Sequence, residues 1–424
     1  MSTRAAFGLL LVATSTDSLP LGETVSAAVT PTRLRVDYLD APLAIDNAAP
    51  TFSWEVEAAE GERAVTAACS LAVKTMDPAG GIVLSEARST LAPGDSFTFV
   101  PLPSGITLAS DTAYSWTVTC GSSTASSSFS TGLLKASDWG ASTWIGGGTS
   151  AGEAVLMRKT FTVSGTFKRA RLFLAVPGYG QASINGADVD GDAGTRSWSQ
   201  YDTRTLYHTY DVSKEVKAGE NVLGLHIGKG WYGMWGYGNP TAKAVLRIDG
   251  KTVVMTDSTW QQGVSPVLMD SEYNGVTYNA SMETAGWDTP DCKSCASWSS
   301  ISSTGTTAAP KLGNTTLSSA SFAAIDVMHT FTAKWMREPK PGTYVFDFTQ
   351  NIAGWVKIKI TGTAGTTITL RHAEALQHPP YGPRDGNIYV GNLRGAKATD
   401  IYILKGDPEG EEFQPVFTQV RNDN

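Results

Sequence analysis

The chain has 424 residues, a length that suggests about three domains. Hydrophobic residues make up 41% of it and charged residues 17%, so the chain can form packed cores and does not have the composition of a disordered polypeptide. The formal net charge is −7, which argues against nucleic acid as a partner, because binding to phosphates needs clustered Lys and Arg. No apolar run reaches the roughly 18 residues that a membrane-spanning helix needs, so we expect no membrane partner.

Residues 1–30 have the features of a weak secretory signal peptide or of a tail. Arg4 is followed by the short apolar run 5–13, and small residues follow near position 27. The gap between the two features is long and contains acidic residues. We expect a secreted, extracellular protein, and a disordered cytosolic tail is the alternative.

Residues 31–136 are interpreted as one β-sandwich. Short strand-like runs such as 70–73 and 114–118 are separated by turn-forming residues, which is typical of such a fold. Cys69 and Cys120 lie in or beside two of these strands. A disulfide in an oxidising compartment and two small buried thiols are both consistent with this pattern.

Residues 137–300 are interpreted as a second, larger β domain without long amphipathic helices. The run 170–176 is apolar throughout and indicates a buried strand. The segment 244–255 predicts a hairpin, because Asp249-Gly250 between two apolar runs suits a two-residue turn.

Two pairs of residues between positions 279 and 314 suggest covalent modification. Cys292 and Cys295 lie in a Ser-rich loop, so a small loop disulfide or two free thiols is expected. A zinc site is not expected, because a second ligand pair is missing. Asn279 and Asn314 begin two sequons that would be glycosylated if a eukaryotic cell secretes the chain.

Residues 301–324 are rich in Ser and Thr and are interpreted as a linker. In residues 325–424 two runs alternate, with Tyr344, Phe346 and Phe348 predicted on one face of the first and Val356, Ile358 and Ile360 inward in the second. This pattern predicts an antiparallel sheet with one solvated face. The predicted fold class is therefore all-β, with three consecutive antiparallel β-sandwich domains.

A cluster of aromatic residues in the glycine-rich segment 228–238 is the clearest candidate binding site. Sugar rings stack on exposed aromatic faces, while their hydroxyl groups need a few fixed polar partners. The alternative is that these aromatic residues pack against a neighbouring domain. The candidate residues are Trp231, Tyr232, Trp235 and Tyr237, with Asn239, Asp190 and Asp192 as the polar contacts.

Several short motifs occur in a fixed order along the chain. They are Pro50-Thr51-Phe52-Ser53-Trp54, Ile184-Asn185-Gly186, Gly230-Trp231-Tyr232 and Asp347-Phe348-Thr349-Gln350-Asn351-Ile352-Ala353-Gly354-Trp355. In this order the chain resembles the N-terminal half of bacterial-type α-L-rhamnosidases of glycoside hydrolase family 78. The resemblance implies a fibronectin-III-like sandwich over 31–136, a rhamnosidase N-terminal sandwich of jelly-roll or galactose-binding-like type over 137–300, and a concanavalin-like sandwich over 325–424.

The resemblance also implies where the chemistry takes place. Members of the family are similar to inverting glycosidases, which use one carboxylic acid and one carboxylate on opposite faces of the sugar. In the family both groups come from a helical barrel, and the barrel is not recognisable here, so no catalytic residue is assigned and the third domain is expected to be truncated. Asp347 and Glu374 are expected to be structural carboxylates, and His208, His226 and His372 structural histidines.

We therefore expect an accessory N-terminal part of an α-L-rhamnosidase that hydrolyses terminal L-rhamnose from glycosides or polysaccharides, with this part inactive alone. The alternative is a stand-alone carbohydrate-binding protein. Either reading implies a rhamnose-containing glycan or glycoside as the partner. The oligomeric state is open.

Three positions depart from the family pattern. The segment 275–281 lacks two carboxylates and a guanidinium that the family usually has, and Thr349 stands where the family often has Gly. In relatives that bind rhamnose through calcium, an acid–amide pair occupies the place of Tyr179-Gly180. No cofactor is therefore expected, and calcium lacks its expected ligand pair.

Overall fold

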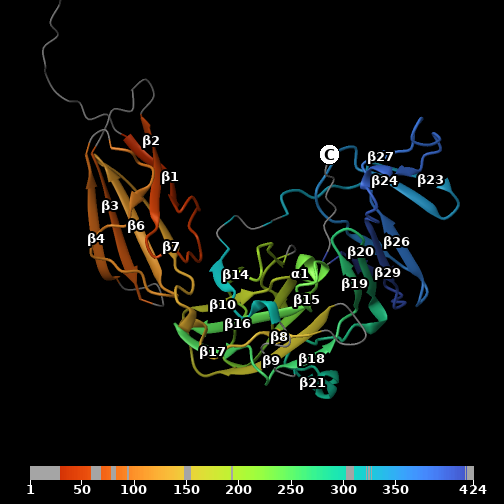
Figure 1. Ribbon diagram of the computed structural model, residues 1–424, viewed down its shortest axis with the longest axis horizontal. Helices are drawn as coiled ribbons and strands as arrows, with labels where there is room; N and C mark the ends of the chain where they lie inside the picture. Colours follow the sequence, from red (N-terminus) through yellow and green to blue (C-terminus); the bar gives the residue numbers. More distant parts are fainter. Residues whose placement is uncertain are drawn as a thin grey trace, which may run out of the picture.

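The computed structural model describes residues 29–58, 68–77, 83–92, 95–147, 154–191, 194–301, 310–320, 322, 325, 327–415 and 417. These residues form three β-rich bodies in chain order, with the first in orange, the second in yellow and green, and the third mainly in blue (Figure 1). The predicted all-β fold class is confirmed. Almost all of the segment interpreted as a signal peptide or tail lies outside the described residues.

The first body is a sandwich of two small sheets. One sheet has the order β1-β2-β5 and the other the order β4-β3-β6-β7. Side chains of β6 alternate between half-buried and buried, as expected for a strand with one face on the core, and Trp116 lies at the centre of that core. The strands are β1 Val29–Val36, β2 Thr51–Ala58, β3 Cys69–Met76, β4 Val83–Leu91, β5 Val100–Pro101, β6 Ala113–Cys120 and β7 Ser123–Ser130.

The second body packs two larger sheets around an aliphatic core. Strands β10 and β15 run through the middle of the two sheets, and nearly every one of their residues is buried. The first sheet contains β8 Ile145–Gly146, β10 Ala170–Ala175, β14 Arg204–Asp211, β16 Thr241–Ile248, β17 Lys251–Met255 and β22 Thr316–Ser319. The second contains β9 Val155–Val163, β11 Tyr179–Ile184, β12 Ala187–Asp188, β13 Thr195–Arg196, β15 Gly219–Gly228, β18 Gln261–Val264 and β21 Ser299–Ser300.

Strand β22 lies inside the segment that was predicted to be a linker. It pairs in parallel with β14, and its Ser319 donates a backbone hydrogen bond of 2.6 Å to the carboxylate of Asp46 in the first body. The linker interpretation therefore does not hold for residues 316–319. Low charge and many hydroxyl side chains indicate a loop by composition, but they are also compatible with a strand at the edge of a sheet, where β14 offers an open partner.

The third body is centred on a four-stranded sheet with the order β19-β20-β29-β26. Its first two strands come from the segment assigned to the second domain, so this sheet crosses the boundary that we placed at residue 300. Strands β20 and β29 pair in parallel, whereas we predicted antiparallel pairing throughout. The strands are β19 Val267–Ser271, β20 Gly275–Asn279, β26 Thr367–Arg371 and β29 Thr399–Ile403.

The rest of the third body consists of two-stranded pairs with much exposed apolar surface. In the hairpin of β23 and β24, the large side chains Trp335, Met336, Tyr344 and Phe346 are each more than half exposed. The pairs are β23 Trp335–Lys340 with β24 Thr343–Asp347, β25 Ile358–Ile360 with β30 Glu411–Phe413, and β27 Ala375–Leu376 with β28 Ile388–Tyr389. The face that Tyr344 and Phe346 were predicted to share is thus open to solvent.

A buried charge cluster joins the first body to the second. The guanidinium of Arg169 donates to the backbone carbonyl of Asp111 at 2.6 Å and to its Oδ1 at 3.1 Å. Arg171 and Arg247 approach the same carboxylate at 3.6 and 3.9 Å. Burial raises the pKa of Asp111, and the three guanidinium groups oppose that rise.

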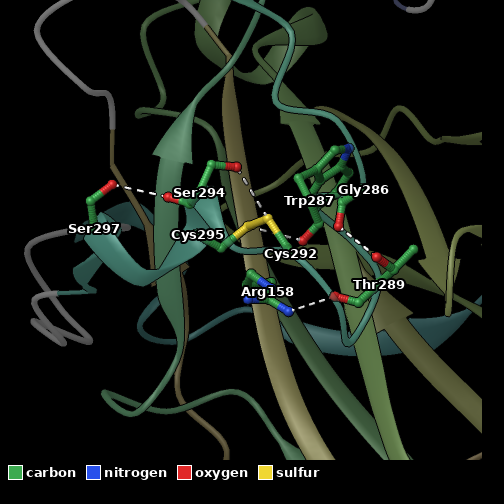
Figure 2. Close-up of a disulfide and its surroundings, with 8 residues drawn as sticks. All are labelled: Arg158, Gly286, Trp287, Thr289, Cys292, Ser294, Cys295 and Ser297. Carbon is green, nitrogen blue, oxygen red and sulfur yellow. Dashed lines mark hydrogen bonds between the residues drawn. A yellow bond between two sulfur atoms is a disulfide. The ribbon is translucent and has the colours of Figure 1, made fainter.

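Both pairs of cysteines form disulfides. Cys69 and Cys120 face each other on the adjacent strands β3 and β6. Cys292 and Cys295 close a short turn on the surface of the second body, beside Trp287 and above Arg158 (Figure 2). The guanidinium of Arg158 donates to the backbone carbonyl of Thr289 at 2.9 Å, which ties this loop to the sheet below it.

The charge cluster leads to a prediction about stability. Replacing Asp111 by Ala leaves three largely buried guanidinium groups without their counter-charge, so the free energy of unfolding should fall by about 3–5 kcal/mol. Urea denaturation measures the change. The matched control is Glu55→Ala, which breaks the exposed pair between Arg33 and Glu55 and should change stability little. Equal effects of the two substitutions would contradict the role of the cluster.

The disulfides lead to a second prediction. A disulfide restricts the unfolded chain more when it closes a longer loop. Cys69 and Cys120 are 51 residues apart and Cys292 and Cys295 only 3. Replacing each pair by Ala should therefore cost about 4 kcal/mol for the first and about 2 kcal/mol for the second. Chemical denaturation of the two double variants compares them, and a larger loss for the second pair would contradict the expectation.

Candidate functional site

The predicted aromatic cluster lies in and directly after a short helix at the rim of the second body. This helix, α1, spans Gly230–Met234 directly after β15. Gly230 has a positive φ of 49°, and a Cβ there would lie 3.0 Å from the backbone of Gly178, so the position favours glycine. The carboxylate of Asp270 accepts hydrogen bonds from the backbone of Lys229 at 2.6 Å and of Gly230 at 3.2 Å, which fixes the entry into the helix.

Two of the four predicted aromatic residues belong to the core. Tyr232 is fully buried and packs edge-on against Tyr201, with ring centroids 5.3 Å apart. Tyr237 stacks on Tyr232 and is only partly buried, and the ammonium of Lys311 lies 5.0 Å from its ring centroid. For these two residues the packing alternative describes the contacts.

The other two predicted aromatic residues join two that the sequence did not single out. Trp231 stacks on Trp198 at 5.3 Å and on Trp235 at 6.2 Å, with interplanar angles of 15° and 11°. Tyr273 packs nearly perpendicular to Trp231, with ring centroids 5.3 Å apart. The exposed fractions of Trp198, Trp235 and Tyr273 are 68%, 59% and 47%. We call these four residues, Trp198, Trp231, Trp235 and Tyr273, the aromatic platform.

The three residues predicted to be polar contacts for a sugar have different surroundings. Asp190 accepts hydrogen bonds from the backbone of Ala182 and the hydroxyl of Thr195, so it links β11 to β13. Burial, reinforced by the charge of Asp188, raises the pKa of Asp190 to about 7. Asn239 is exposed. Asp192 lies outside the described residues.

The three histidines have polar partners within the fold. His208 and His226 are hydrogen-bonded through Nε2 to the hydroxyls of Ser197 at 2.6 Å and Ser265 at 2.8 Å. Burial lowers the pKa of His208 to about 4 and that of His226 to about 3. His372 contacts a buried aspartate at 3.0 Å. These contacts are those of structural residues.

The two carboxylates considered for catalysis also have structural contacts. Asp347 Oδ1 accepts a hydrogen bond of 2.7 Å from the backbone of Thr349. Thr349 has a φ of 64°, a conformation that favours glycine, and this hydrogen bond supports the strained position. Glu374 accepts a hydrogen bond from the side chain of Asn392 at 3.3 Å.

The structure also places the two sequons and the position at which relatives bind calcium. Asn279 is half-buried and its Oδ1 accepts hydrogen bonds from the backbone and hydroxyl of Ser281, whereas Asn314 is exposed. At the position of the family's acid–amide pair, Tyr179 stacks on Phe417. Within the described ranges, no group of three or more His, Cys, Asp or Glu side chains is placed to hold a metal ion. Nor does any helix there have the length and apolar character to cross a membrane.

The buried histidines predict how stability depends on pH. Their pKa values in the folded chain lie below the ordinary value near 6.5, so the unfolded chain binds more protons as the pH falls. Between pH 6.5 and 5 the free energy of unfolding should fall by about 2 kcal/mol for each histidine. In urea titrations His226→Gln should reduce the loss of stability between pH 6.5 and 5 by about 2 kcal/mol, and the exposed His329→Gln should not. An unchanged pH dependence in His226→Gln would contradict the assignment.

Three family models match the chain in order. Residues 31–135 match the Rha78A-like N-terminal immunoglobulin domain, residues 165–325 the α-L-rhamnosidase N-terminal domain, and residues 337–420 the bacterial α-L-rhamnosidase concanavalin-like domain. An α-L-rhamnosidase of Streptomyces avermitilis is 35% identical over 67% of this chain and 28% of its own length. One from Formosa agariphila is 26% identical over 97% of this chain and 47% of its own length.

Solved structures show the same likeness. The α-L-rhamnosidase from Dictyoglumus thermophilum is 28% identical with a TM-score of 0.78, over 93% of this chain and 46% of that one. The Streptomyces avermitilis enzyme complexed with L-rhamnose, at 22% identity and a TM-score of 0.77 over 92% of this chain and 55% of that one, supports the fold. The chain thus spans about half the length of these solved structures. It spans less than half the length of the two sequence relatives. Its three bodies belong to the N-terminal domain families of the bacterial α-L-rhamnosidases.

Proposed function

We propose that this chain is the accessory N-terminal part of an α-L-rhamnosidase that releases terminal L-rhamnose from glycosides or polysaccharides. The observation that carries the proposal is the match to three rhamnosidase domain families, in order, in a chain that spans less than half of its sequence relatives. In this function the β domains support a catalytic domain and do not carry the acid and base themselves.

The contacts of the candidate carboxylates support this division of labour. Inverting glycosidases need two carboxyl groups about 6.5–9.5 Å apart with the sugar between them. Asp347 is engaged by a backbone amide in a tight turn, and Glu374 by the side chain of Asn392. Both are therefore occupied in local structure.

The exposed hairpin of β23 and β24 is a second observation that supports the accessory role. Trp335 and Phe346 are 62% and 56% exposed within a domain of only moderate core size. Contiguous exposed apolar surface marks interaction sites, because leaving it in water is unfavourable. In the proposed function this surface contacts the catalytic domain.

We also infer an extracellular location. Disulfides persist in oxidising compartments, and this chain contains two of them. The signal-like features of residues 1–30 agree with this inference.

A stand-alone carbohydrate-binding protein is the second candidate function. The exposed aromatic platform favours it, because such a surface can contact sugar rings without a catalytic domain.

The proposed function predicts the outcome of an activity assay. The purified 424-residue chain should release no nitrophenol from p-nitrophenyl α-L-rhamnopyranoside above the buffer rate. Transcript sequencing past the codon for Asn424 should reveal a longer chain, and that longer chain should hydrolyse the same substrate. Hydrolysis by the 424-residue chain itself would contradict the proposal, and a transcript that ends there would favour the second function.

A further inference from the structure

The two disulfides of the chain differ in their access to solvent. Cys69 and Cys120 lie on the adjacent inner strands β3 and β6 and are 1% and 0% exposed. In the second disulfide, Cys292 is partly exposed and Cys295 is buried. Thiol–disulfide exchange begins when a thiolate attacks one sulfur, so its rate depends on access to that sulfur. In the folded chain an incoming thiol can therefore reach Cys292, whereas the first disulfide is shielded by the core around it.

Both sulfurs of the surface disulfide lie next to a polar group that suits the reduced form (Figure 2). Ser294 Oγ lies 3.5 Å from Cys292 Sγ, and the hydroxyl is the donor, because a disulfide sulfur carries no proton. The same hydroxyl can donate to a thiolate. Cys295 Sγ lies 3.7 Å from the backbone carbonyl of Trp287, which can accept the S–H of a reduced Cys295. Reduction would thus leave neither sulfur without a polar neighbour.

The loop around this disulfide has anchors that do not depend on the S–S bond. The ring of Trp287 packs on Gly224 of β15, and the ring of Trp298 packs on Gly263 of β18. A Cβ at either glycine would overlap the indole above it. The two indoles stack with centroids 6.2 Å apart, and Arg158 ties the same loop to β9. Since the disulfide spans only 3 residues, its reduction is expected to be a local event that leaves the fold intact.

We propose that Cys292 and Cys295 form a redox-active disulfide that exchanges with low-molecular-weight thiols while the chain stays folded. The thiolate of such a molecule attacks Cys292 Sγ, the S–S bond breaks, and Cys295 leaves as a thiolate that takes up a proton. A second thiolate attacks the small-molecule sulfur of the mixed disulfide. Cys292 is then released as a thiolate that is also protonated, and the small molecule departs as its own disulfide. Two thiols have been oxidised and one disulfide reduced, and a small-molecule disulfide reverses the sequence.

This site is independent of the proposed function, because none of its residues belongs to the aromatic platform or to the exposed hairpin of β23 and β24. Its chemistry needs no catalytic domain. Hydrolysis of rhamnosides and thiol exchange can therefore succeed or fail separately.

The first test follows both disulfides of the full chain during incubation with dithiothreitol. Iodoacetamide blocks the free thiols at intervals, and peptide mass spectrometry measures which cysteines are modified. Cys292 and Cys295 should become reduced more than about tenfold faster than Cys69 and Cys120, with an unchanged circular dichroism spectrum. Oxidised glutathione should then restore the disulfide. Equal rates for the two pairs, or reduction of Cys292 and Cys295 only in urea that unfolds the chain, would overturn the proposal.

Single-cysteine variants test which sulfur is attacked. Cys295→Ala leaves the partly exposed thiol of Cys292, and Cys292→Ala leaves the buried thiol of Cys295. Oxidised glutathione should form a mixed disulfide with the first variant about tenfold faster than with the second, as whole-protein mass spectrometry would show. Circular dichroism establishes that both variants are folded. Equal rates would contradict the proposed order of attack.

A substitution beside the disulfide tests the role of the hydroxyl group. Ser294→Ala removes the donor next to Cys292 Sγ, so the thiolate of the reduced chain loses a stabilising contact and alkylation of Cys292 should slow about threefold. The matched control is Ser297→Ala in the same short helix, since the Ser297 hydroxyl donates to the carbonyl of Ser294 at 3.0 Å. Its alkylation rate should equal that of the parent chain. The same rate in both variants would overturn the role assigned to Ser294.

Discussion

The arrangement of this molecule depends on one hairpin, formed by β19 and β20. Its β20 strand pairs in parallel with β29, more than a hundred residues later in the chain, and so builds the centre of the last sheet. Near the end of its β19 strand, Asp270 holds the start of α1 in the preceding body. The same turn carries Tyr273 into perpendicular contact with Trp231. A single short element thereby sets both the last sheet and the aromatic rim.

The first body is attached by a different kind of contact. There the interface combines the charge cluster around Asp111 with direct hydrogen bonds such as that from the backbone of Leu133 to the hydroxyl of Tyr207, at 2.8 Å. Such buried polar contacts allow only one relative arrangement of the two bodies, because a buried polar or charged group that loses its partner costs free energy. The first two bodies are therefore joined by directional contacts, whereas the central sheet of the third body takes two of its four strands from the chain segment between β18 and β21 of the second body.

Local features of the sequence predicted local structure well. The segment 244–255 forms β16 and β17 with Ile248 opposite Lys251, and Asp249 and Gly250 both have positive φ, as a two-residue turn of this kind requires. Motif order correctly placed the chain among rhamnosidase N-terminal domains. These features depend on neighbours in the chain, which a sequence displays directly.

Features that depend on distant residues could not be predicted in this way. Trp198 and Tyr273 are single aromatic residues in turn regions, and only the fold brings them to Trp231. Tyr232 has a local sequence setting like that of Trp235, yet it is fully buried, and Tyr237, beyond the end of α1, stacks on it. The parallel pairing of β20 with β29 leaves no periodic signal, since each strand alone has an ordinary pattern.

The sheet of β19, β20, β29 and β26 also bears on how such proteins can be recombined during evolution. A crossover placed between β20 and β29 would combine the two halves of one sheet from different parents, and Val276 would have to find a new acceptor in place of the buried carboxylate of Asp400. The second and third bodies are thus inherited as one unit, although separate family models describe them. The immunoglobulin-like body, which joins through discrete hydrogen bonds and the charge cluster around Asp111, is the more exchangeable module.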